Sequence, residues 1–191
     1  MDQFKLYFDL GFDHVLDMGG LDHFYFLVAL TLPFGYKHWR KLLLWVSLFT
    51  LGHSLALLVT HFEWIRINSK WVEFLIPITI CITCLSILSQ KKHAQWSGFW
   101  INFITLFFGI IHGFGFGRYF KLMVSEGEAV AALLEFAIGV EFAQILIVLA
   151  MVGINFVALD LLKANRNKWQ WVVAAMVLSQ AVVMTTNNWP F

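Results

Sequence analysis

Residues 129–157, AVAALLEFAIGVEFAQILIVLAMVGINFV, form a long apolar run that contains only two charged side chains, Glu135 and Glu141. A helix needs about 20 residues to cross the hydrocarbon core of a bilayer, so this run predicts a transmembrane helix. The rest of the chain has the same character. Of its 191 residues, 60% are hydrophobic and only 13% are charged, whereas a soluble domain carries about 25% charged residues. The sequence therefore predicts an integral membrane protein.

Apolar segments of this kind recur along the whole chain. We expect an all-α, polytopic bundle of about six transmembrane helices, with residues 1–191 forming a single domain. The first span is the least regular, because DHVLDMGGLDH interrupts its outer portion. The pair Gly19-Gly20 predicts either a kink or the true start of the span after a short lip helix. The expected spans are residues 12–34, 42–61, 71–89, 97–118, 129–157 and 169–186.

The basic residues predict how the helices cross the membrane. One set of loops carries eight Lys and Arg residues, and the opposite side carries five. Because basic residues concentrate in cytoplasmic loops, both termini are expected on the outer, periplasmic side. The net charge of +1 and the lack of longer basic runs argue against nucleic-acid binding. The eight basic residues are Lys37, Arg40, Lys41, Lys91, Lys92, Lys163, Arg166 and Lys168.

Ionisable side chains inside these spans predict a functional site. Each costs about 2.5–3.5 kcal/mol in a bilayer and usually serves a function. With the predicted orientation, five of them reach a similar depth in the outer half of the bundle. Imidazole and carboxylate groups are ligands for Ni, Co, Zn or non-haem iron. We therefore expect a divalent metal site formed by Asp22, His23, His53, His112 and Glu141.

The sequence does not decide which of these residues bind the metal directly. Asp22 and His23 are adjacent, about 100° apart on a helix, so they cannot point in one direction, and either one is a possible ligand. Taken singly, a membrane histidine more often hydrogen-bonds a neighbouring helix than binds metal, and only the shared depth favours a site. The residues expected to support the ligands are His14, Ser54, Gln144 and Glu73.

Two other motifs predict packing rather than chemistry. Gly109, Gly113 and Gly117 recur at four-residue spacing, which lets another helix backbone approach closely. Cys81 and Cys84 lie within an apolar span, where we expect small-residue packing rather than a disulfide.

Five segments carry a resemblance to a known family. They are HVLDMGGLDHFYFLVAL, FTLGHSLALL, VEFLIPITI, FGIIHGFGF and FAIGVEFAQILIV, and they occur in order over nearly the whole chain. With them the sequence resembles the HupE/UreJ family of small polytopic membrane proteins. The resemblance implies a bacterial inner-membrane location and secondary transport of nickel or cobalt, linked to hydrogenase and urease maturation. It marks His14, Asp22, His23, His53-Ser54, His112-Gly113, Glu141 and Gln144 as the family's motif residues.

Three functions are compatible with this sequence. A metal permease would take the ion from the outer face and pass it inward, although the spans below Glu141 and Gln144 are nearly all apolar. A membrane-embedded zinc hydrolase would use the same residues to activate water against a lipid-like substrate. A non-catalytic assembly subunit would use them to hold helices or a partner together. A homo-oligomer or a membrane partner is compatible with each of the three.

Overall fold

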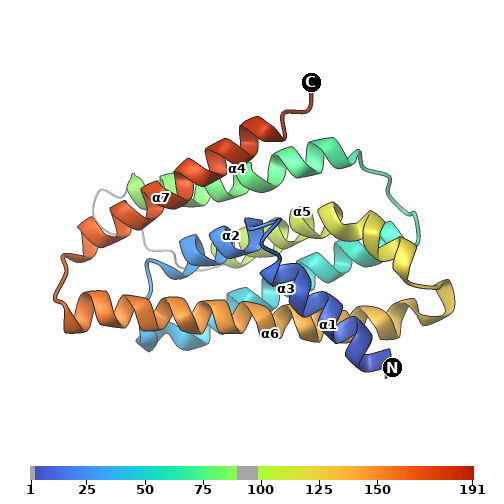
Figure 1. The fold of residues 1–191 in the computed structure, drawn as a ribbon, viewed down its shortest axis with the longest axis horizontal. Coiled ribbons are helices and arrows are strands. Elements are labelled where there is room, and N and C mark those ends of the chain that lie inside the picture. Colours follow the sequence, from blue (N-terminus) through green and yellow to red (C-terminus); the bar gives the residue numbers. More distant parts are fainter. Residues whose placement is uncertain (1–2, 90–98) are drawn as a thin grey trace.

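The computed structural model describes residues 3–89 and 99–191. In these residues the chain forms seven α-helices arranged as a bundle (Figure 1). A 3₁₀ turn precedes α3, a second one precedes α6, and a π-helical turn, Val157–Leu161, continues α6. The helices are α1 (Gln3–Leu16), α2 (Asp22–Thr31), α3 (Trp39–His61), α4 (Ser69–Leu88), α5 (Phe99–Met123), α6 (Ala129–Phe156) and α7 (Arg166–Asn187).

Five helical segments are long and apolar enough to cross a membrane by length and composition. They match the last five expected spans to within six residues at each end. The expected start of the fourth span at residue 97 lies outside the described residues, as do Lys91 and Lys92, which the topology prediction used. The five segments are Tyr36–His61, Ser69–Leu88, Ile101–Met123, Ala129–Leu161 and Arg166–Asn187.

The expected first span, residues 12–34, is not one helix. It is divided into α1 and α2 by a turn at residues 17–21. The Asp17 carboxylate accepts the backbone N–H of Gly19 at 2.8 Å, and the Gly20 N–H donates to the Asp17 carbonyl oxygen at 3.1 Å. These local bonds satisfy the backbone without a helix, which is why such residues favour turns. With ten residues, α2 is about 15 Å long, half of the roughly 30 Å hydrocarbon core.

Helix α2 lies inside the bundle. It packs against α4, α6 and α7 (Figure 1), and its residues Phe26 to Leu32 are all buried. Side chains from α6 and α7 hold the chain just after it. Asn155 Nδ2 donates to the Phe34 carbonyl oxygen at 3.1 Å, and Trp169 Nε1 donates to Asn155 Oδ1 at 2.9 Å. The short helix is therefore fixed at its C-terminal end by two longer ones.

Helices α3 and α5 pack closely and share the most extensive contact between two helices in the described residues, as the glycine spacing predicts. A Cβ atom at Gly109 would overlap the carbonyl oxygen of Phe49, and one at Gly113 would overlap that of His53. At Gly117 it would meet the side chain of Thr60 at 2.7 Å. The packing function expected for this glycine stripe is confirmed.

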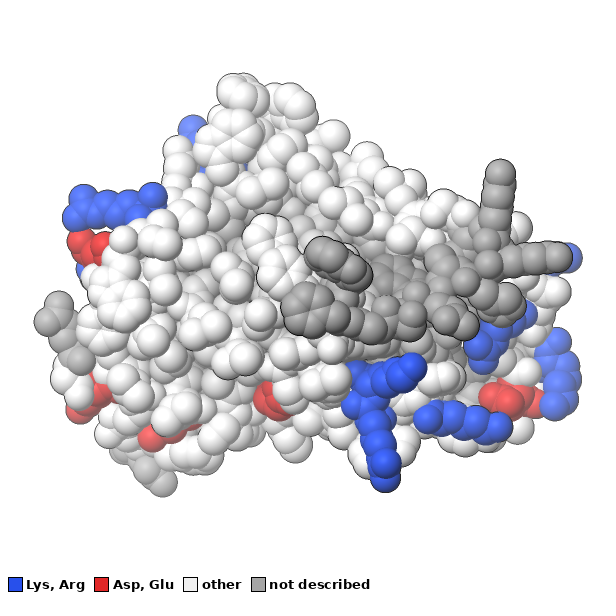
Figure 2. Space-filling view, turned by 180° about the vertical axis from the view of Figure 1, so that it is seen from behind, with Lys and Arg blue, Asp and Glu red and all other residues white. Residues whose placement is uncertain are grey.

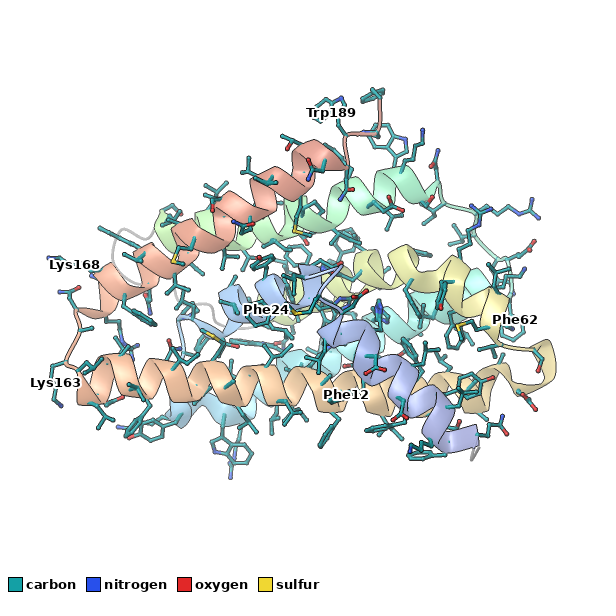
Figure 3. All side chains as sticks on the ribbon, viewed as in Figure 1. Phe12, Phe24, Phe62, Lys163, Lys168 and Trp189 are labelled. Atoms are coloured by element: carbon teal, nitrogen blue, oxygen red, sulfur yellow. The ribbon has the colours of Figure 1, made fainter. Side chains whose placement is uncertain are left out.

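The surface of the bundle suits lipid. Large apolar side chains are exposed along the long helices, for example Leu134 and Leu149 on α6. Most of the face in Figure 2 carries no charged side chain. Figure 3 places Lys163, in the loop before α7, and Lys168, in the first turn of α7, at the end of the bundle opposite Phe62. Which of these ends faces the periplasm stays a prediction.

Candidate metal centre

Three histidine side chains meet where the first expected span is broken. His14 lies near the end of α1, His23 is the second residue of α2, and His53 lies in the middle of α3. Each offers a ring nitrogen, and these atoms all lie within 4.8 Å of one another. In residues 3–89 and 99–191, this is the one group of three or more potential ligand residues close enough to hold a single metal ion.

The backbone explains why these residues converge. The turn at residues 17–21 folds the chain back, so that the ends of α1 and α2 bring His14 and His23 to a ring separation of 4.8 Å. An uninterrupted helix would have separated them by about 13 Å along its axis. The close approach of Gly113 to the His53 carbonyl oxygen fixes α3 against α5.

His112 on α5 is the fourth histidine at this position. Its ring centroid lies 5.3 Å from that of His23. Its Nδ1 atom lies 2.8 Å from the Phe108 carbonyl oxygen, and a carbonyl can only accept, so Nδ1 carries the proton. The lone pair of the neutral ring is then on Nε2, which is buried and makes no hydrogen bond to the described residues.

Asp22 is in direct contact with His23. Its Oδ1 atom accepts the His23 backbone N–H at 2.8 Å and lies 3.0 Å from His23 Nδ1. A carboxylate in this position places the imidazole proton on Nδ1 and leaves Nε2 unprotonated, as in carboxylate–histidine–metal arrangements. Of this adjacent pair, His23 is therefore the residue that meets the other histidines, and Asp22 contacts the His23 ring at Nδ1.

The free nitrogens of the four rings lack partners. His23 and His53 are 2% and 1% exposed. A buried polar atom without a hydrogen bond costs about 1–3 kcal/mol, and native proteins hold few of them. Their concentration at one position is typical of groups that receive a ligand. Within the described part of the chain, the buried atoms without a hydrogen bond here are His14 Nε2, His23 Nε2, both ring nitrogens of His53 and His112 Nε2.

Two layers of phenylalanine rings enclose the histidines. We call Phe116, Phe120 and Phe136 the upper layer; the His14 and Phe116 ring centroids are 4.0 Å apart, and the His53 ring stacks on Phe136 at 6.1 Å. The lower layer lies toward the start of α3 and consists of Phe26, Phe49 and Phe108. The ring centroids of Phe26 and Phe49 lie 5.0 Å apart, and Phe49 lies 5.0 Å from His112. The centre is thus polar between two apolar layers.

A family model described as HupE / UreJ protein matches residues 1–189. The chain belongs to the HupE/UreJ family. This family is associated with nickel and cobalt transport. No curated protein and no solved structure shows detectable similarity to the chain. With its five candidate spans, this HupE/UreJ protein is a multi-pass membrane protein.

Two expected site residues of this HupE/UreJ protein, both on α6, make hydrogen bonds to α3. Glu141, predicted as a ligand, accepts a hydrogen bond from Ser47 Oγ at 2.6 Å and is not in the group of three histidines. Gln144 is fully buried, and its Oε1 accepts from Thr50 Oγ1 at 3.4 Å. Both residues bridge α6 to α3. The depth of a residue along a helix can be predicted from the sequence. Because α6 is apolar on all sides, the sequence does not indicate toward which neighbouring helix the Glu141 side chain points.

The residues that we expected to support the ligands of the HupE/UreJ protein lie in different surroundings. His14, expected only to support the ligands, is one of the three converging histidines. Ser54 is half-buried beside His53, and Glu73 is exposed on α4. The aromatic layers were not predicted, although a signal exists. Phe49 and His53 on α3, and Phe108, His112 and Phe116 on α5, recur at four-residue spacing and so share one helix face.

Proposed function

We propose that this HupE/UreJ protein is a permease for a divalent transition metal of the nickel or cobalt type in the bacterial inner membrane. The observation that supports this most strongly is the convergence of His14, His23 and His53, with ring nitrogens within 4.8 Å of one another inside the bundle. Intramembrane ionisable groups mark ion pathways. The ion is the cargo of the protein rather than a resident cofactor.

The donor set suits a borderline metal ion. His14, His23 and His53 would bind it through imidazole nitrogen, and His112 Nε2 is the candidate fourth donor. Imidazole suits Ni, Co and Zn, whereas Mg and Ca prefer oxygen and softer ions prefer thiolate. Asp22 supplies negative charge in direct contact with His23. We assign Asp22 to orienting the ligand, and Glu141, which bonds to Ser47, to a function outside the metal centre.

The broken first span supports transport rather than permanent storage. Secondary transporters bind their substrates where helices are discontinuous, near the middle of the membrane. Here the turn at residues 17–21, of which residues 17–19 are exposed, adjoins the histidines. Phenylalanine rings cover the centre toward both ends. This arrangement fits an occluded state of an alternating-access cycle, in which each layer opens in turn.

The test is metal uptake into proteoliposomes that contain a trapped metal-sensitive dye. The wild-type protein is expected to admit Ni²⁺ or Co²⁺, and His23→Ala and His53→Ala are each expected to abolish uptake. His38→Ala is the matched control, because His38 is an exposed histidine at the start of α3.

The competing functions predict different outcomes of the same test. One tightly held metal per chain that never reaches the dye would favour an intramembrane zinc hydrolase, since the Asp22–His23 pair also suits such a site. Absence of metal binding, with histidine variants that only melt at lower temperature, would contradict the permease and favour an assembly subunit.

A further inference from the structure

Another buried histidine lies beyond the upper layer and takes no part in the centre described above. His61 is the last residue of α3 and is only 3% exposed. Neither of its ring nitrogens makes a hydrogen bond to the described residues. An imidazole that is buried without a partner is as unusual here as in the metal centre itself.

His61 is on the same face of α3 as His53. It follows His53 by eight residues, with the buried Leu57 between them, so it lies about 12 Å further along the helix axis. A chain of ring contacts joins the two histidines. The ring centroids are 6.2 Å apart for His61 and Phe120, 5.5 Å for Phe120 and Phe136, and 6.1 Å for Phe136 and His53.

The acidic side chain nearest to His61 along the chain is already paired. Glu63, the nearest acid along the chain, binds Lys121 at the end of α5 and Arg66, with an Arg66 Nη2 to Glu63 Oε2 distance of 2.7 Å. This carboxylate therefore does not orient the His61 ring. The unpartnered nitrogens of His61 remain available to a ligand from outside the chain.

We propose that His61 is a second, transient binding site for the same divalent metal, on the route between this end of the bundle and the histidine centre. The inference rests on the proposed function, because it assumes a metal that reaches the centre. Between His61 and His53, a metal would pass the rings of Phe120 and Phe136 over about 12 Å. One imidazole binds a divalent ion weakly, so His61 would release it readily toward either side.

The test is the kinetics of Co²⁺ binding to the detergent-purified full chain, followed by cobalt absorption in a stopped-flow instrument. In the His61→Ala variant, the association rate and the dissociation rate are both expected to fall, by the same factor. The dissociation constant and the stoichiometry should stay at the wild-type values, because a site on the route changes both rates equally. Leu57→Ala, on the same face of α3 between the two histidines, is the control for lost packing. His61→Gln repeats the test with a residue of similar size.

The outcomes separate this inference from the proposed function. Unchanged rates in both His61 variants would overturn the inference and leave the metal centre intact. A loss of stoichiometric binding in His61→Gln would also overturn it, because His61 would then belong to the centre. If the wild-type chain binds no Co²⁺, the proposed function fails, and the inference fails with it.

A second measurement serves if the His61 variants do not fold. In a His53→Ala chain, whose centre has lost one ligand, weak Co²⁺ binding is expected to remain, and modification of the remaining histidines with diethyl pyrocarbonate should abolish it. Protection of His61 from this reagent by Co²⁺, read by mass spectrometry, would support the transient site. Equal modification of His61 with and without Co²⁺ would overturn it.

Discussion

The carboxylate of Asp22 lies 3.0 Å from Nδ1 of His23. We expect Asp22→Asn to preserve the fold and to lower the affinity for Ni²⁺ about 10–100-fold, the usual effect of losing the group that orients a metal ligand. Isothermal titration of the purified protein measures this. Glu73→Gln is the control, since Glu73 is exposed on α4. An unchanged affinity in Asp22→Asn would show that the carboxylate does not act through His23.

For Glu141, also a single residue, we predict no effect of substitution on metal affinity. Because its carboxylate accepts a hydrogen bond from Ser47 and lies outside the group of three histidines, Glu141→Gln should leave the dissociation constant for Ni²⁺ unchanged. The glutamine can still accept the serine proton, so the contact between α3 and α6 is kept. A large loss of affinity in the same titration would return Glu141 to the ligand set.

At the scale of elements, the close packing of α3 against α5 depends on glycine residues. A Cβ atom at Gly109 would overlap the Phe49 carbonyl oxygen, so Gly109→Ala must move one backbone away from the other. Such overpacking costs about 1–3 kcal/mol, and the melting temperature in detergent should fall. The control is Gly153→Ala on α6, where a Cβ would meet nothing within 4 Å; alanine in a helix interior stabilises by about 0.5–1 kcal/mol. Equal melting temperatures for the two variants would contradict the packing.

The contact between the end of α5 and the loop after α3 predicts a pH dependence. Lys121 and Arg66 hydrogen-bond Glu63 and lower its pKa from 4.5 to about 2. A carboxyl group with a lowered pKa contributes stability above its unfolded pKa of about 4.5 and loses it as the pH falls toward 2. Glu63→Gln should therefore flatten the dependence of the melting temperature on pH between 5 and 2. A slope identical to that of the wild-type protein would show that the contact does not form in solution.

At the scale of the whole molecule, apolar runs were sufficient to predict five long helices, because each needs only length and hydrophobicity. The first span was harder. Asp17, Gly19 and Gly20 indicated an interruption, but nothing local predicted that α2 would lie inside the bundle, since that depends on its contacts with α4, α6 and α7. For the same reason, the sequence predicted His14 only as a residue that supports the ligands, and not as one of the converging histidines. Its distance from His23 is set by the turn and not by their separation along the chain.

The orientation of the helix bundle in the membrane is a prediction about the whole molecule. Aromatic residues after α7 pack against the start of α4, with the Phe74 and Trp189 ring centroids 5.2 Å apart. The positive-inside rule places this end of the bundle in the periplasm. Alkaline phosphatase fused after Phe191 should therefore be active, and the same enzyme inserted at Asn165, between α6 and α7, should be inactive. The reverse pattern would invert the topology and with it the direction of transport.

The most direct test of the metal centre is X-ray absorption spectroscopy of the purified protein loaded with one equivalent of Zn²⁺. Binding by His14, His23 and His53 predicts at least three nitrogen neighbours at about 2.0–2.1 Å, with the multiple scattering of imidazole rings. The signal should lose one imidazole in His53→Ala and none in His38→Ala. A first shell of oxygen atoms without imidazole scattering, or one that His53→Ala does not alter, would contradict the histidine centre.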